Sequence, residues 1–168
     1  MNLYIIRHAI AVDRDGPDYP DDSQRPLTSK GRAKMEQIAG GLGQMELEID
    51  LILSSPYLRA SQTARILAKS FRIPDRLKFT PALLPDAPAG QIINDINEKF
   101  SQFENVMLVG HEPSLSSLIA TLISGDPTLN ITLKKGGICH LSMEQLAYGR
   151  CATLEWLLYP LLLTNLHE

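Results

Sequence analysis

Short apolar runs alternate with helix-like segments along this chain, and two of these runs end in a histidine. One run leads into Arg7 and His8, and a later run leads into Gly110 and His111. Apolar runs of this length are typical of strands that are buried on both faces of a parallel sheet. The carboxyl ends of parallel strands meet at one edge of the sheet, where α/β proteins bind their ligands. The pattern therefore predicts an α/β fold with both histidines in one crevice.

The remaining pattern predicts a mostly parallel sheet with helices on both faces and an antiparallel hairpin at its edge. We expect parallel strands at residues 3–7, 51–53, 77–80 and 106–109. We expect helices over residues 28–45 and 90–100 and in the segments that Pro56 and Pro113 open, with Thr28 as an N-cap. The hairpin would pair residues 138–143 with 151–158, and the apolar residues 154–166 would form a strand and a tail.

Length and charge exclude several classes of protein. A chain of 168 residues with 44% hydrophobic residues suits one domain over residues 1–168. A net charge of -3 gives no indication of nucleic acid or an anionic membrane as partner. The first apolar run is too short for a signal-peptide core or a membrane span, so we expect a soluble, cytoplasmic protein. Cys139 and Cys151 lie outside any zinc-ligand spacing, so no structural metal is expected.

Three strand-to-helix junctions carry polar residues that suit phosphate chemistry. The first holds Arg7 and His8, the second, residues 54–60, holds Arg59, and the third holds His111. Guanidinium groups and helix N-termini are the donors that a phosphate dianion requires, and histidine can act as a nucleophile. The junctions together predict a phosphoryl-binding site. The aspartate-rich residues 13–25 favour an irregular, solvated loop over a metal site.

The segments that carry these residues resemble the histidine phosphatase superfamily, and within it the small SixA-type phosphohistidine phosphatases. The matching segments are residues 7–8, 25–31, 54–64 and 110–113. Four ordered matches at suitable spacing are far more specific than any one dipeptide, and they extend over nearly the whole chain. One departure from the pattern is Ala9, where most relatives have glycine.

The resemblance implies a three-layer α/β/α, phosphoglycerate mutase-like fold and a covalent mechanism that needs no cofactor or metal. His8 would attack phosphorus in line, and water would then release the phosphoryl group. Arg7, Arg59 and His111 would bind the phosphoryl oxygens, where charge shifts during transfer. Further contacts to the substrate are expected from Arg25, Ser54 and Gly110.

The short segment before the helix at residues 90–100 indicates the substrate class. Larger relatives often carry an insertion here with a carboxylate that protonates an alcohol leaving group. Residues 81–90 are short by comparison, and their only carboxylate is that of Asp86. Asp86 could be that acid, or it could serve only in the loop or as a helix cap. A weak acid favours N–P over O–P substrates, because an imidazole with a pKa of about 6.5 can be protonated before it leaves.

A short insertion also predicts a shallow, open pocket that a phosphohistidine on a protein could reach. The expected partner is a phosphohistidine-bearing protein, such as a phosphotransfer domain or a phosphocarrier. Two alternatives stay open at this point. One is a phosphatase for small phosphomonoesters, and the other is a catalytically idle module that binds phosphorylated partners.

Overall fold

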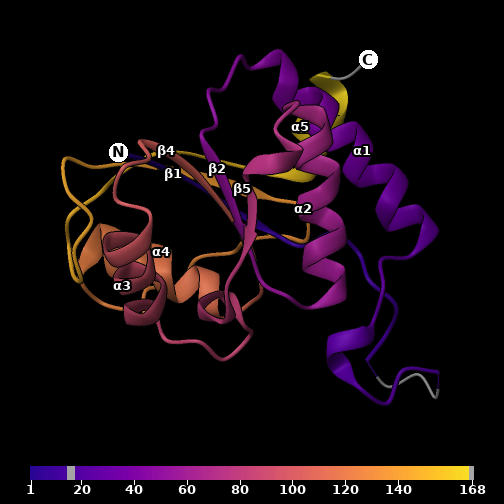
Figure 1. Ribbon diagram of the computed structural model, residues 1–168, viewed down its shortest axis with the longest axis horizontal. Coiled ribbons are helices and arrows are strands. Elements are labelled where there is room, and N and C mark those ends of the chain that lie inside the picture. The colour runs from indigo at the N-terminus through magenta and orange to yellow at the C-terminus, as the bar shows by residue number, and fades with distance from the viewer. Residues whose placement is uncertain (15–17, 167–168) are drawn as a thin grey trace.

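The computed structural model describes residues 1–14 and 18–166, which build a six-stranded mixed sheet (Figure 1). The strands are β1 (Asn2–Arg7), β2 (Leu51–Ser54), β3 (Leu77–Phe79), β4 (Asn105–Gly110), β5 (Ile138–Ser142) and β6 (Thr153–Leu158). Their spatial order is β3-β2-β4-β1-β5-β6. The first four strands are parallel, and β5 is antiparallel to both of its neighbours, β1 and β6. The predicted parallel core and antiparallel hairpin are both confirmed.

Helices cover both faces of this sheet and give the predicted three-layer α/β/α arrangement (Figure 1). One face is covered by α1 (Ser29–Gln44), α2 (Leu58–Ser70) and α5 (Pro160–Leu166), and the other by α3 (Ala89–Lys99) and α4 (Ser114–Ser124). Three short 3-10 helices lie in the loops: η1 (Asp22–Gln24), η2 (Pro74–Arg76) and η3 (Pro81–Leu83).

The position of β1 between two helical layers explains why its residues 3–6 are all apolar. Leu3 and Ile5 pack into the core beneath α3 and α4, whereas Tyr4 and Ile6 pack into the core beneath α1 and α2. Successive side chains of a strand point to opposite faces, so a strand between two helical layers needs apolar residues at every position. The polar residues of β1 are therefore confined to its two ends, Asn2 and Arg7.

Most α-helix boundaries agree with the sequence prediction, and one α-helix was missed. The Thr28 side chain caps α1 by accepting from the backbone N–H of Gly31 at 2.9 Å, as predicted. Helix α2 begins at Leu58, two residues after the predicted opening at Pro56. The prediction of a tail after β6 was wrong, because Pro160 at its first position starts α5. None of the helices in the described residues has the length and apolarity to span a bilayer.

Helix α5 is held against α1 by a close approach at Gly41. A β-carbon at this position would lie 2.0 Å from the backbone oxygen of Leu163, so only glycine lets the two helices meet. We expect Gly41→Ala to lower the free energy of unfolding by about 1–3 kcal/mol through overpacking. Gly43, in the same helix, has nothing within 4 Å of its β-carbon position, so Gly43→Ala should raise stability by about 0.5–1 kcal/mol. Urea unfolding of both variants checks this; equal effects would contradict it.

Candidate active site

Three neighbouring strands end at one edge of the sheet and bring the predicted residues together. Arg7 of β1 is in register with Gly110 of β4, and Ser54 of β2 is in register with Val109 of β4. The residues that follow these strands therefore meet above one edge, as the βα-junction argument predicts. A pocket of about 430 Å³ opens there, and its lining includes Arg7, His8, Arg25, Arg59, Asp86 and His111.

The hydrogen bonds of His8 fix which ring nitrogen is available for reaction. The Nδ1 atom lies 2.7 Å from the carbonyl oxygen of Ala9, which can only accept, so Nδ1 carries the proton. The Nε2 atom lies 3.3 Å from the Nε of Arg59, which can only donate, so Nε2 holds a lone pair. Both contacts select the same tautomer, and its free lone pair is the one that a nucleophile needs.

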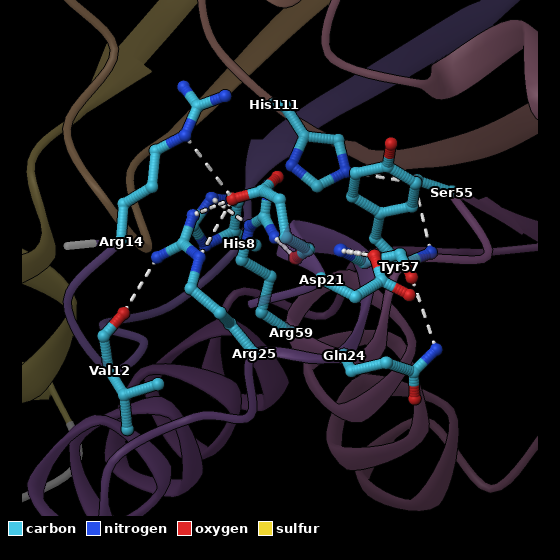
Figure 2. Close-up of polar contacts among 12 residues, drawn as sticks. His8, Val12, Arg14, Asp21, Gln24, Arg25, Ser55, Tyr57, Arg59 and His111 are labelled. Atoms are coloured by element: carbon cyan, nitrogen blue, oxygen red, sulfur yellow. Dashed lines mark hydrogen bonds and ion pairs between the residues drawn. The ribbon is translucent and has the colours of Figure 1, made fainter. Parts of the chain in front are cut away.

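Arg59 lies in the first turn of α2 and joins His8 to the segment after β1 (Figure 2). Its Nη1 donates to the backbone carbonyl of Asp22 at 2.7 Å, and its Nη2 donates to Oδ2 of the same residue at 2.9 Å. Arg25 pairs with the second carboxylate oxygen of Asp22 at 2.8 Å. One carboxylate thus bridges two guanidinium groups of the predicted phosphoryl site.

Asp22 is ionised because of these contacts. Burial alone would raise the pKa of its carboxyl group, but hydrogen bonds and charge from Arg59 and Arg25 outweigh burial and lower that pKa. The interpretation of residues 13–25 as a solvated loop was therefore wrong for Asp22, which lies in η1 and lines the pocket. Residues 15–17 of that loop lie outside the described part of the chain.

His111 is held on the other side of His8 by a serine and a tyrosine. Its Nε2 lies 2.8 Å from the Oγ of Ser55, and its ring meets that of Tyr57 edge-on, with 5.3 Å between centroids (Figure 2). The His8 and His111 rings are 5.1 Å apart between centroids. Among the described residues, neither the Nδ1 of His111 nor the Nε of Arg7 has a hydrogen-bond partner, although both atoms are buried. Buried polar atoms of this kind suit an oxyanion ligand.

Burial and neighbouring cations keep both histidines neutral. Burial lowers the pKa of His8 to about 3, and the charges of Arg59, Arg7 and Lys135 act in the same direction while the Ala9 carbonyl opposes them. Burial, aided by His8 and Arg59, lowers the pKa of His111 to about 2. At neutral pH the His8 lone pair is therefore not lost to a proton.

The depressed histidine pKa values should make the fold less stable in mild acid. Below pH 6.5 the unfolded chain takes up a proton on His8 that the folded chain binds only near pH 3, so stability falls as the pH falls through this interval. Each such histidine contributes a slope of at most about 1.4 kcal/mol per pH unit. Urea unfolding at about pH 7 and about pH 5 measures the loss. His8→Gln should show a shallower dependence; an identical slope would contradict this assignment.

The other predicted site residues differ in how they meet the pocket. Arg25 and Asp86 line it, Asp86 from the loop between η3 and α3. Ser54 does not face it, because its hydroxyl is buried and donates to the Ser55 carbonyl at 2.9 Å. Gly110 acts through its backbone, whose carbonyl accepts from the His8 N–H at 3.0 Å. A β-carbon at Gly110 would lie 3.1 Å from a methyl carbon of Leu115, so the junction is tightly packed.

Sequence reasoning missed Asp22, Ser55 and Tyr57. The position of Asp22, three residues before Arg25, was a usable signal, because a short turn places such a pair side by side. Only the strand register decides that Ser55, and not Ser54, faces His111. In the described part of the chain, no group of three or more His, Cys, Asp or Glu side chains is arranged to hold a metal ion.

Comparison with known proteins points to one family. The family model of the histidine phosphatase superfamily, branch 1, matches residues 3–83. An uncharacterised protein of Picosynechococcus sp. is 37% identical over 84% of this chain and 84% of its own length. Phosphohistidine phosphatase SixA of Escherichia coli is 27% identical over 95% of this chain and 94% of its own.

Solved structures agree with the sequence matches. The protein histidine phosphatase SixA in complex with tungstate superposes with a TM-score of 0.82 at 27% identity, covering 97% of this chain and 99% of that one. A putative alpha-ribazole-5'-P phosphatase from E. coli has a TM-score of 0.75 at 21% identity, over 95% of this chain and 97% of its own. The second likeness is one of fold.

Proposed function

Since this chain belongs to the histidine phosphatase superfamily, we propose that it hydrolyses phosphohistidine on a protein through a phosphoryl intermediate on His8. The observation that carries the proposal is the state of His8, a buried neutral imidazole whose Nε2 lone pair faces Arg59 in a pocket that Arg7 and Arg25 also line. A site for binding alone would have no use for an unprotonated imidazole among arginines.

The reaction divides into two transfers at the same atom. In the first, the Nε2 lone pair of His8 attacks phosphorus while the N–P bond of the substrate breaks. The substrate's ring, protonated beforehand on its other nitrogen, keeps the electron pair of that bond and leaves as neutral imidazole. In the second, water attacks phosphorus, the bond to Nε2 breaks, and inorganic phosphate departs. Arg59 must release Nε2 and turn its donors to the phosphoryl oxygens, where Arg7 and His111 can also bind. Positioned hydrogen-bond donors, two of them the cationic guanidinium groups of Arg7 and Arg59, stabilise the charge that develops during transfer.

The carboxylates of the pocket favour a nitrogen leaving group. Asp22 is held ionised by two arginines, so it is a poor proton donor. Asp86 is exposed at the rim, and Glu112 accepts from the backbone N–H of Ser116 at 3.2 Å. An alkoxide leaves slowly without an acid that is held in place, whereas an imidazole accepts its proton beforehand.

Similarity to SixA supports a protein substrate. The name of the E. coli relative specifies phosphohistidine, and its sequence aligns with 95% of this chain. The tungstate in the SixA structure is a tetrahedral oxyanion like phosphate. The β3–α3 connection, residues 80–88, holds only η3, which leaves the pocket accessible to a large substrate. Arginines can neutralise the phosphoryl group without a metal. The predicted partner remains a cytoplasmic phosphotransfer domain or phosphocarrier.

The test compares phosphate release from a histidine-phosphorylated phosphotransfer domain, a phosphoserine peptide and glycerol phosphate, with EDTA present. We expect the phosphohistidine protein to react faster by about 10²-fold or more, the range that a missing general acid costs an ester. Equal rates, or faster release from glycerol phosphate, would make the chain a small-molecule phosphatase. Phosphate binding without any turnover would make it a binding module, and loss of activity in EDTA would refute metal independence.

A further inference from the structure

A second groove opens beside the catalytic pocket and shares Arg7 and Lys135 with it. Its volume is about 810 Å³, within the range of ligand-binding clefts. Its apolar lining comes from the segment after β1 and from the junction of β6 with α5, namely Ile10, Tyr159, Pro160, Leu161 and Leu162. The proposed reaction uses none of these five side chains.

The leucines of this groove are exposed although their helix is firmly anchored. Leu161 is 66% exposed and Leu162 is 52% exposed, whereas Leu163 is fully buried. The close contact of Gly41 with the Leu163 backbone fixes α5 against α1. The two exposed leucines therefore form a fixed apolar surface, and such surfaces beside a functional site mark interaction sites.

The turn that carries Lys134 and Lys135 is joined to β1, the strand that leads into His8, by hydrogen bonds. Gly136 donates its backbone N–H to the carbonyl of Arg7 at 3.0 Å, and the Arg7 Nη1 donates to the carbonyl of Leu133 at 3.1 Å. The groove and the phosphoryl pocket are thus held at fixed relative positions. A partner seated in the groove would present its neighbouring residues to His8 in a defined orientation.

The groove differs in charge from the rest of the molecule. In the part of the chain that the structure describes, the charged side chains lining the groove are all cationic: Arg7, Lys34, Lys134 and Lys135. This contrasts with the net charge of -3 for the whole chain. In the catalytic pocket, by contrast, the segment after β1 contributes both signs of charge: Asp13, Arg14, Asp22 and Arg25. A partner with carboxylates beside its phosphohistidine would therefore be attracted toward the groove.

We infer that this groove is the docking surface for the phosphoprotein substrate, and that it receives an apolar patch bordered by carboxylates next to the phosphohistidine. The inference rests on the proposed function and adds the partner's surface chemistry to it. A histidine side chain is short, so its phosphoryl group reaches His8 only when the carrier's own surface lies against the pocket rim. The rim next to Arg7 and Lys135 is this groove, whose lining combines apolar side chains with lysines.

The experiment compares two N–P substrates of different size, a histidine-phosphorylated phosphotransfer domain and N-phosphoimidazole. Leu162→Asp and Lys34→Glu change the groove without touching the catalytic pocket. For the protein substrate we expect each to lower kcat/KM by about tenfold, mostly through KM, as for a central interface residue. Hydrolysis of N-phosphoimidazole should be unchanged, because that substrate does not reach the groove.

Matched controls are available at residues that line neither the groove nor the catalytic pocket. Leu154 is 44% exposed at the start of β6, and Lys69 is exposed at the end of α2, so Leu154→Asp and Lys69→Glu should leave both rates unchanged. Equal losses on both substrates, or no loss on either, would overturn the docking surface. So would a dimer of the wild type that Leu162→Asp dissociates in sedimentation. If the wild type hydrolyses neither substrate, the proposed function itself fails.

Discussion

Replacing His8 with alanine is expected to lower the rate of phosphohistidine hydrolysis by about 10³-fold or more, because it removes the Nε2 lone pair that we propose as the nucleophile. The wild type, quenched rapidly during turnover, should carry phosphate in a bond that is stable in alkali and labile in acid, as a phosphoramidate is. Rapid-quench mass spectrometry of wild type and His8→Ala measures this intermediate directly.

A second partly buried histidine provides the control. His140 stacks on Tyr4 with 4.5 Å between ring centroids, and its Nε2 lies 3.0 Å from Asn2, near the opposite end of β1. His140→Gln should retain both the rate and the phosphorylated intermediate. An intermediate that persists in His8→Ala would move the nucleophile elsewhere.

Replacing Arg59 should have an effect of similar size for a different reason. Arg59→Ala removes a cation from the transferring phosphoryl group, for which a loss of about 10³-fold in kcat is typical. Arg59→Lys should recover only part of it, because an ammonium group cannot reproduce the planar fork of donors. The same charge lowers the pKa of His8, so in Arg59→Ala the acid limb of the pH–rate profile should move to higher pH.

Arg65, six residues further along α2, is the matched control for Arg59. Its guanidinium lies over the ring of Phe79 at 5.6 Å and does not line the pocket. Arg65→Ala should leave kcat unchanged. Equal losses of activity in Arg59→Ala and Arg65→Ala would contradict the assignment.

Asp22→Asn should strengthen the binding of inorganic phosphate, whereas Arg59→Ala should weaken it. The substitution removes the carboxylate that competes for Arg59, so phosphate should bind about tenfold more tightly.

The sheet and the catalytic strand ends were predictable because their signals are local. A strand buried on both faces must be apolar at every position, so the end of the apolar run marks where β1 leaves the sheet at Arg7. Parallel strands then bring His8, Arg59 and His111 to one edge whatever the details of the loops. Thr28 likewise caps α1 through a hydrogen bond to Gly31, only three residues further along the chain.

The elements that were missed depend on contacts between distant parts of the chain. A glycine within a helix does not indicate in the sequence what packs against it, yet Gly41 is where α5 packs on α1. In the sequence, nothing distinguishes Asp22 from the other aspartates of its loop. Its role depends on hydrogen bonds from Arg59, which is distant in the sequence. Choosing Ser55 over Ser54 requires the strand register, which a sequence pattern does not fix to one residue.

The central place of β1, between β4 and β5, bears on how such a protein can change over evolution. A substitution at the floor of the pocket would disturb strands that hold the whole sheet together. The rim is built from surface segments, at residues 84–88, at residues 134–135 and at the start of α5, where substitutions cost little stability. Substrate range can therefore drift, or be engineered by loop grafting, while the phosphoryl-transfer chemistry is inherited unchanged.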